Sequence, residues 1–111
     1  MATFEEVRNV PNNPEVYLID VRNADEVAST GLIPGSINIP LHDLEDAFTM
    51  SERHFQHRYN RDKPSKNSVI IFSCLKGVRA QKGTDLARSY GFKRAKTYHG
   101  SWSEWSKRHG F

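Results

Sequence analysis

The sequence contains a single cysteine among its 111 residues, and this scarcity limits the chemistry open to it. One cysteine excludes a disulfide within the chain. It also excludes a structural zinc site built on paired cysteines. A lone cysteine is most often a small, buried apolar residue, so a reactive role for Cys74 has to be argued from its surroundings.

Long hydrophobic runs are also lacking. The longest apolar stretch, Val69 to Phe72, is far too short to cross a bilayer. The N-terminus has neither a basic nor an apolar segment, and its early residues Glu5 and Glu6 argue against a transit peptide. We therefore expect a cytoplasmic or nuclear protein with no membrane partner.

Repeats and low-complexity segments are absent, and the composition is ordinary. Hydrophobic residues make up 37% of the chain and charged residues 26%, which is typical of a globular domain rather than of a disordered or fibrous chain. The length suits one domain, and the polar stretch 59–67 is typical of a surface loop. The sequence therefore predicts a single domain over residues 1–111.

The formal net charge is +3, and Lys and Arg become frequent from Arg58 onward. Such a charge is compatible with an anionic partner. No nucleic-acid-binding motif accompanies these residues, so we expect a solvated basic face and no nucleic-acid partner. A small anionic substrate needs only local positive charge.

Strand and helix patterns alternate along the chain. Strands are predicted over 17–21, 36–39, 68–73 and 95–98, from short β-prone or apolar runs. Helices are predicted from residue 4 to before Pro11, over 25–28, 41–48, 51–57 and 78–90, and after a cap at Ser101. This alternation indicates a parallel α/β sheet, which binds ligands beyond the carboxyl ends of its strands.

Cys74 follows the most apolar predicted strand and precedes a helix. The first N–H groups of a helix have no intrahelical partner, so they can stabilise a thiolate at the turn. Gly77 permits a curled backbone, and Lys76 and Arg79 add two cations. An inert cysteine at a strand end is the alternative, but these coinciding features favour a reactive thiol.

The segment Cys74–Arg79, Cys-Leu-Lys-Gly-Val-Arg, resembles the active-site loop of the rhodaneses, the thiosulfate sulfurtransferases. Three further segments resemble motifs of that family in the same order. They are 18–22 (Leu-Ile-Asp-Val-Arg), 31–40 (Gly-Leu-Ile-Pro-Gly-Ser-Ile-Asn-Ile-Pro) and 99–105 (His-Gly-Ser-Trp-Ser-Glu-Trp). The likeness runs from about residue 3 to 108 and is greatest to the short single-domain eukaryotic members.

The resemblance implies a rhodanese-like three-layer α/β/α fold with a central, mostly parallel sheet of four to five strands. It also implies a sulfurtransferase in which the Cys74 thiolate takes sulfur from a small anionic donor, thiosulfate or a persulfide. The Cys74 persulfide would then pass this sulfur to cyanide or to a thiol such as glutathione or thioredoxin. No metal or organic cofactor is expected.

The resemblance also assigns roles to residues. Cys74 is the nucleophile, and Lys76 and Arg79 attract the donor and hold the sulfite leaving group. Backbone amides are expected to form a cradle for the anionic sulfur, namely those of Leu75, Lys76, Gly77, Val78 and Arg79. Asp20 and Arg22 are expected near the pocket as scaffold residues that tie down neighbouring loops.

Two positions depart from the family pattern. His99 replaces the first glycine of the C-terminal motif, where it either narrows the pocket, adds a titrating group or packs at the strand end. Leu75 stands where many members carry a polar residue, so the preferred donor stays open.

Trp102 and Trp105 share a helical face and are expected to cover the sheet, with Trp102 the candidate for a pocket wall.

Two other function classes compete with this interpretation. Dual-specificity-type phosphatases and arsenate reductases resemble the fold but carry five residues between the cysteine and the arginine of the loop. This chain has four residues there, 75–78. A non-catalytic rhodanese-like binding or signalling module is the second alternative, and the retention of Cys74 with Lys76 and Arg79 argues against it. No apolar surface stripe stands out, so a monomer is expected, and a role in stress response is suggested by analogy only.

Overall fold

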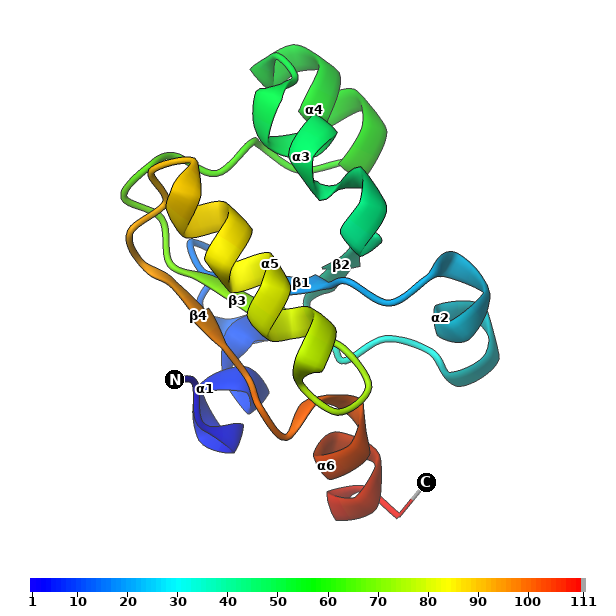
Figure 1. The fold of residues 1–111 in the computed structure, drawn as a ribbon. Coiled ribbons are helices and arrows are strands. Elements are labelled where there is room, and N and C mark those ends of the chain that lie inside the picture. The colour runs from blue at the N-terminus through cyan, green and yellow to red at the C-terminus, as the bar shows by residue number, and fades with distance from the viewer. Residues whose placement is uncertain (111) are drawn as a thin grey trace.

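The computed structural model describes residues 1–110, in which short strands alternate with helices (Figure 1). The strands are β1 (Tyr17–Asp20), β2 (Ser36–Asn38), β3 (Ile70–Ser73) and β4 (Ala95–Thr97). The helices are α1 (Phe4–Arg8), α2 (Ala24–Thr30), α3 (Leu44–Thr49), α4 (Glu52–Tyr59), α5 (Val78–Ser89) and α6 (Ser101–Arg108), with 3-10 turns η1 (Val10–Asn12) and η2 (Leu41–Asp43). Within these residues, none of the helices combines the length and the apolar character that crossing a membrane requires.

The sheet has the strand order β2-β1-β3-β4, and each neighbouring pair is parallel. Ile19 lies opposite Ile37 on one side and Phe72 on the other, and Asp20 lies opposite Ser73. The predicted α/β class is thus confirmed. Over residues 1–110 the sheet has four strands and is entirely parallel, where the resemblance allowed four to five strands and a mostly parallel sheet.

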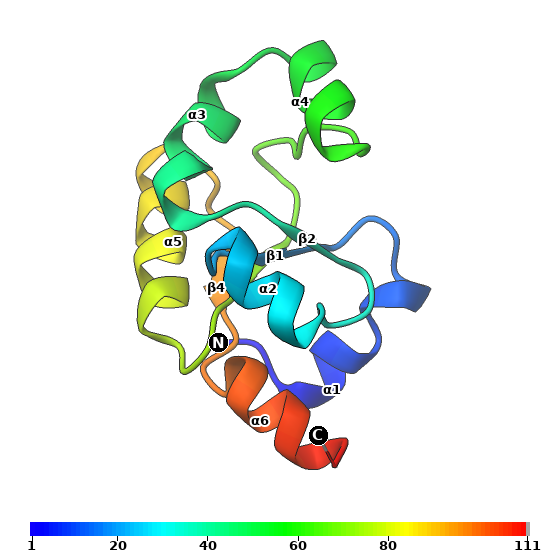
Figure 2. The ribbon, with the colours of Figure 1, turned by 90° about the vertical axis from the view of Figure 1, so that its right-hand side faces the viewer.

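Helices cover both faces of the sheet, which makes the three layers that the resemblance implied (Figures 1 and 2). Because successive side chains of a strand point to opposite faces, Ile19 and Phe72 join the core beneath α3, α4 and α5. Leu18 and Ile71 join the second core beneath α1 and α6. Burial on both faces explains why β3 is almost continuously apolar.

Local signals placed most helix ends to within two residues. A capping box fixes the start of α1 at the predicted residue, since the Glu6 N–H donates to the Thr3 hydroxyl and the Thr3 N–H donates to the Glu6 carboxylate. The predicted helix over 41–48 is divided, because η2 precedes α3.

The prediction that Ser101 caps the last helix is wrong. Gly100 precedes α6, and Ser101 is its first residue, with a left-handed φ of 52°. Its hydroxyl bonds inward, to the backbone of Tyr98 and of Cys74, instead of to the N–H groups of its own helix. This inward direction makes Ser101 part of the candidate site.

Candidate active site at the carboxyl end of the sheet

Cys74 lies in the turn between β3 and α5, beyond the carboxyl edge of the parallel sheet. Its exposed fraction is 1%, so the thiol is enclosed by its own loop and by neighbouring elements. The predicted position is therefore the observed one. Cys74 also belongs to the core beneath α5, which fixes the base of the loop.

Two backbone amides point at the sulfur. The Gly77 N–H donates to Cys74 Sγ over 3.0 Å, and the Ala80 N–H donates over 3.3 Å. The Ala80 amide, in the first turn of α5, is not among the amides of residues 75–79 that were predicted to form the cradle. These amides direct positive dipole at Sγ, so an anionic sulfur at this position would have two hydrogen-bond donors. A direct role for the amides of Leu75, Lys76, Val78 and Arg79 stays a prediction.

Position 77 requires glycine, both for its backbone conformation and for the space around it. Its φ is 99°, in the left-handed region, and a Cβ there would lie 2.8 Å from the His99 carbonyl oxygen. A side chain would therefore clash with backbone and strain the turn. The close approach of Gly77 to His99 joins the loop to the segment that follows β4.

Ser101 is a site residue that sequence reasoning missed. The Cys74 N–H donates to its Oγ over 3.1 Å, and that Oγ lies 2.8 Å from the Tyr98 carbonyl oxygen and 3.9 Å from Cys74 Sγ. One hydroxyl proton serves one acceptor at a time, and the shorter distance favours the carbonyl. The sequence signal that could have found Ser101 is its place beside Gly100 in the C-terminal motif.

The first turn of α6 also holds the loop. The Trp102 N–H donates to the Cys74 carbonyl over 2.9 Å, and the Ser103 N–H donates to the Leu75 carbonyl over 3.0 Å. Trp102 and Trp105 are both buried in the core beneath α6, as the prediction that they cover the sheet requires. The loop is thus bonded on one side by α5 and on the other by α6.

Asp20 and Arg22 form a buried ion pair at the same edge of the sheet, with side-chain exposures of 2% and 1%. Arg22 Nη2 lies 2.8 Å from Asp20 Oδ2, and Arg22 also donates to the Thr30 hydroxyl and to the Gly31 carbonyl. Its guanidinium lies 5.1 Å from the ring of Trp102. Arg22 therefore connects β1, the end of α2 and α6, in agreement with the predicted scaffold role.

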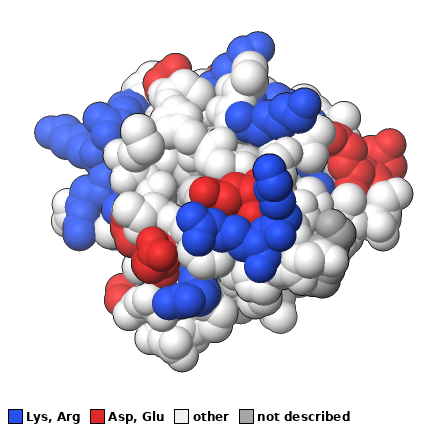
Figure 3. All heavy atoms as spheres, turned by 90° about the horizontal axis from the view of Figure 1, so that it is seen from below, with Lys and Arg blue, Asp and Glu red and all other residues white. Residues whose placement is uncertain are grey.

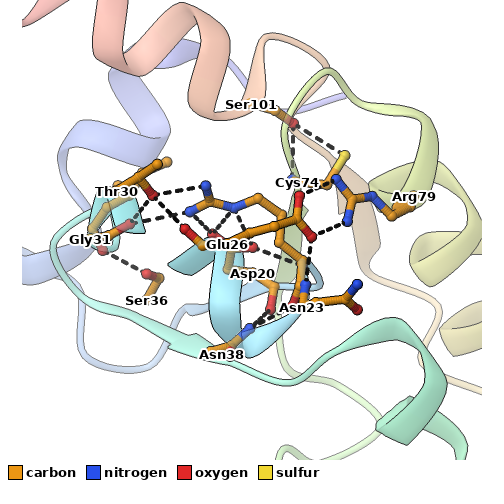
Figure 4. Close-up of polar contacts among 12 residues, drawn as sticks. Asp20, Asn23, Glu26, Thr30, Gly31, Ser36, Asn38, Cys74, Arg79 and Ser101 are labelled. Atoms are coloured by element: carbon orange, nitrogen blue, oxygen red, sulfur yellow. Dashed lines mark hydrogen bonds and ion pairs between the residues drawn. The ribbon is translucent and has the colours of Figure 1, made fainter. Parts of the chain in front are cut away.

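Arg79 makes a second arginine–carboxylate pair, which sequence reasoning did not foresee. Its Nη1 and Nη2 donate to the two carboxylate oxygens of Glu26 over 2.6 and 3.0 Å (Figure 4). These hydrogen bonds lower the pKa of Glu26 to about 2, helped by the Asn23 N–H. Glu26 raises the pKa of Arg79 in turn, and the nearby Cys74 adds to this. Glu26 is 53 residues from Arg79, so no local pattern marks the pair.

The outer rim of the loop is open to solvent. A hollow of about 450 Å³ is lined by Lys76, Gly77, Val78, Gln81, Lys82 and His99. His99 is exposed, so it lines this hollow and does not pack into the core. A larger hollow of about 700 Å³ lies along α4 and contains none of the predicted site residues, so chemistry rather than size identifies the site.

The charged groups around the site are mixed. Figure 3 shows Lys and Arg interspersed with Asp and Glu on the face that includes α6. Within residues 1–110, no three His, Cys, Asp or Glu side chains are grouped closely enough to hold a metal ion.

Comparison with known proteins gives the same assignment along nearly the whole chain. The family model of the Rhodanese-like domain matches residues 3–108. A Rhodanese domain-containing protein of Drosophila melanogaster, CG4456, is 47% identical over 110 residues, which cover 99% of each chain. The human thiosulfate:glutathione sulfurtransferase is 38% identical over 105 residues, covering 94% of this chain and 90% of its own.

A solved structure agrees with the fold. The human single-domain sulfurtransferase TSTD1 superposes with a TM-score of 0.89 at 36% sequence identity. The superposition covers 97% of this chain and 96% of that one. The four-stranded sheet and its flanking helices are thus an arrangement already seen in a sulfurtransferase.

Proposed function

Because the chain belongs to the rhodanese-like domain family, we propose that it is a thiosulfate sulfurtransferase that carries sulfur as a persulfide on Cys74. The observation that carries this proposal is the enclosed Cys74 Sγ, with the N–H groups of Gly77 and Ala80 directed at it. The Cys74 thiolate therefore has two charge-stabilising donors at Sγ, both when it attacks the donor and when it is released again in the second step. The two human relatives are named as sulfurtransferases, and these names suggest the class of reaction.

In the first step, the Cys74 thiolate attacks the outer sulfur of thiosulfate. A new S–S bond forms, the bond to the sulfonate sulfur breaks, and its electron pair leaves with sulfite. The products are a Cys74 persulfide anion and sulfite, so the total charge is unchanged. Splitting one transfer into two steps through a covalent intermediate is nucleophilic catalysis.

In the second step, an acceptor thiolate attacks the outer sulfur of the persulfide. The new persulfide leaves with the acceptor, and Cys74 returns as a thiolate. Glutathione is the acceptor we propose first, because the human relative is named for it. Thioredoxin or another protein thiol is the second candidate, and cyanide would yield thiocyanate by the same route.

The side chains around the loop suggest how the donor is bound. Lys76 lies on the rim of the hollow and makes no ion pair within the described chain, so its ammonium group is free to attract an anion. Arg79 keeps N–H groups beyond the two that Glu26 accepts. Both residues would contact the oxygens of thiosulfate and of departing sulfite.

The remaining parts of the proposal concern the protein in its cell. We propose a cytoplasmic monomer that acts on small molecules and thiols rather than on nucleic acid or membranes. A role in stress response is proposed by analogy. The competing binding-module function requires a Cys74 that does not react, which makes the reactivity of this thiol the point to test.

The purified protein should be incubated with thiosulfate and its intact mass recorded, with Cys74→Ser as the control. We expect a gain of one sulfur atom that cyanide or glutathione removes and that Cys74→Ser never shows. If the mass is unchanged but the thiol alkylates at neutral pH, thiosulfate is the wrong donor and persulfide donors follow. A thiol that neither gains sulfur nor alkylates would leave the binding module as the function.

A further inference from the structure

The solvent-facing side of the loop 74–79 is called the mouth of the site. The charge at this mouth depends on a residue outside the catalytic loop. Glu26, in α2, accepts two hydrogen bonds from Arg79, in the first turn of α5. Figure 4 shows the two side chains directed at each other beside Cys74. A guanidinium held in this bidentate way has its charge balanced by the carboxylate. The sequence alone presents Arg79 as an unpaired cation, whereas the structure pairs it with the Glu26 carboxylate.

Glu26 is held in place by its own helix. The Asn23 N–H donates to Glu26 Oε2 over 2.9 Å, which is one half of a capping box at the start of α2. The other end of α2 is bonded by Arg22, through Thr30 and Gly31. Since α2 buries none of its residues, these polar contacts fix where its carboxylate lies.

The pairing leaves the two basic residues of the loop in different states. A guanidinium has five N–H groups, and Glu26 occupies two of those on Arg79, so others remain for a ligand. Lys76 makes no ion pair within residues 1–110. The mouth therefore offers Lys76 as an unbalanced cation of the loop, with Lys82, which also makes no ion pair within residues 1–110, on the same hollow. Arg79 adds directed donors whose charge is already balanced.

We propose that Glu26 is a positioning residue that sets donor specificity by charge. It directs Arg79 toward the donor while limiting how tightly the site holds a dianion. The limit matters twice in the proposed reaction, because both the donor thiosulfate and the product sulfite are dianions. This inference rests on the proposed sulfur transfer and adds the residue that tunes it.

The test compares two donors that differ in charge. Thiosulfate is a dianion, whereas benzenethiosulfonate is a monoanion with the same S–S bond. In Glu26→Gln, which keeps the size of the side chain, we expect KM for thiosulfate to fall about three- to tenfold, with a smaller change for benzenethiosulfonate. Inhibition by added sulfite should strengthen by a similar factor, and kcat should not rise with the tighter binding.

An equilibrium measurement separates binding from turnover. In a Cys74→Ser background, which cannot accept sulfur, titration calorimetry should show tighter thiosulfate binding when Glu26→Gln is added. The gain should shrink as salt is raised, because it is electrostatic. Glu26→Asp, which keeps the charge, should shift the preference between the two donors far less than Glu26→Gln.

Glu6→Gln is the matched control. Glu6 also closes a capping box and pairs with a cation, but this cation is Lys96 of β4 rather than a residue of the catalytic loop. Two outcomes would overturn the proposal and leave Glu26 as a structural residue. One is an equal loss of activity with both donors in Glu26→Gln, and the other is the same change in donor preference in Glu6→Gln. A wild-type protein inactive with every donor would instead overturn the proposed function.

Discussion

The two arginine–carboxylate pairs at the carboxyl edge of the sheet share their chemistry but differ in burial. Asp20–Arg22 has side-chain exposures of 2% and 1%, whereas both side chains of Glu26–Arg79 are almost one-third exposed. The first pair joins residues two apart in sequence, and the second joins residues 53 apart. The two pairs therefore bear differently on stability and on the reaction.

Burial decides what each pair can do. A buried ion pair has given up the hydration of both charges, so removing one partner leaves a charge with no compensation. A partly exposed pair is screened by water and contributes little to stability, yet it still sets the local potential that a substrate meets. Asp20–Arg22 is thus a support for the loops, and Glu26–Arg79 is an adjustable part of the site.

Asp20→Asn is expected to have the largest effect. It leaves the buried Arg22 guanidinium without its counter-charge, and the free energy of unfolding should fall by about 3–5 kcal/mol. Urea denaturation followed by tryptophan fluorescence measures this. The matched Glu26→Gln variant should lose about 1 kcal/mol or less, and a similar loss in both variants would contradict the distinction between the pairs.

A double variant sharpens the same comparison. Asp20→Asn with Arg22→Met removes both charges and keeps an apolar stem against Trp102. We expect it to be more stable than Asp20→Asn alone, because no uncompensated charge stays buried. A double variant less stable than the single one would mean that the bonds from Arg22 to Thr30 and Gly31 matter more than the charge balance.

Ser101→Ala is expected to have an intermediate effect, because Ser101 is buried like the first pair and lies beside the sulfur like the second. The change leaves the buried Cys74 N–H without its acceptor, which costs about 1–3 kcal/mol. The rate of persulfide formation should also fall. Unfolding and single-turnover kinetics measure the two effects, and Ser106→Ala, in the same helix, should change neither.

Ser101→Gly separates the hydroxyl from the backbone strain. Ser101 has a φ of 52°, which glycine adopts without penalty. Stability should recover in part relative to Ser101→Ala, while the slow persulfide formation stays. Recovery of both would mean that the hydroxyl contributes nothing to the chemistry.

Local sequence signals were sufficient for most of the fold and for the nucleophile. The apolar run of β3, the glycine at 77 and the capping pattern at Thr3 each depend on neighbours within a few residues. Cys74 could be placed for the same reason, since a strand end and a helix start fix its surroundings. Such features can be predicted because the residues that interact to form them lie within one short segment of the sequence.

Contacts between distant segments could not be predicted in this way. Glu26 falls within the helix predicted over 25–28, but its bond to Arg79 depends on where the fold places α2 relative to α5. Ser101 looked like a cap because serine precedes a helix, and its inward hydroxyl depends on where the Cys74 N–H lies. The sequence therefore supplied the nucleophile but not the residues that position its partners.

The smallest expected effect is the acid dependence of the exposed pair. The pKa of Glu26 is lowered to about 2, from an ordinary value of 4.5, chiefly by the hydrogen bonds from Arg79. A carboxylate with a lowered pKa stabilises the fold fully above its unfolded value and loses this contribution as pH falls toward the folded one. Allowing for solvent screening, we expect the contribution at pH 7 to be about 1 kcal/mol.

Urea denaturation of wild type and Glu26→Gln between pH 7 and pH 3 tests this expectation. The difference in unfolding free energy between the two proteins should be constant down to about pH 5 and should then shrink by more than half by about pH 3. A difference that stays constant through the whole range would mean that Glu26 and Arg79 do not interact in solution. The mouth would then carry the full charge of Arg79, and the distinction between the two pairs would rest on the buried one alone.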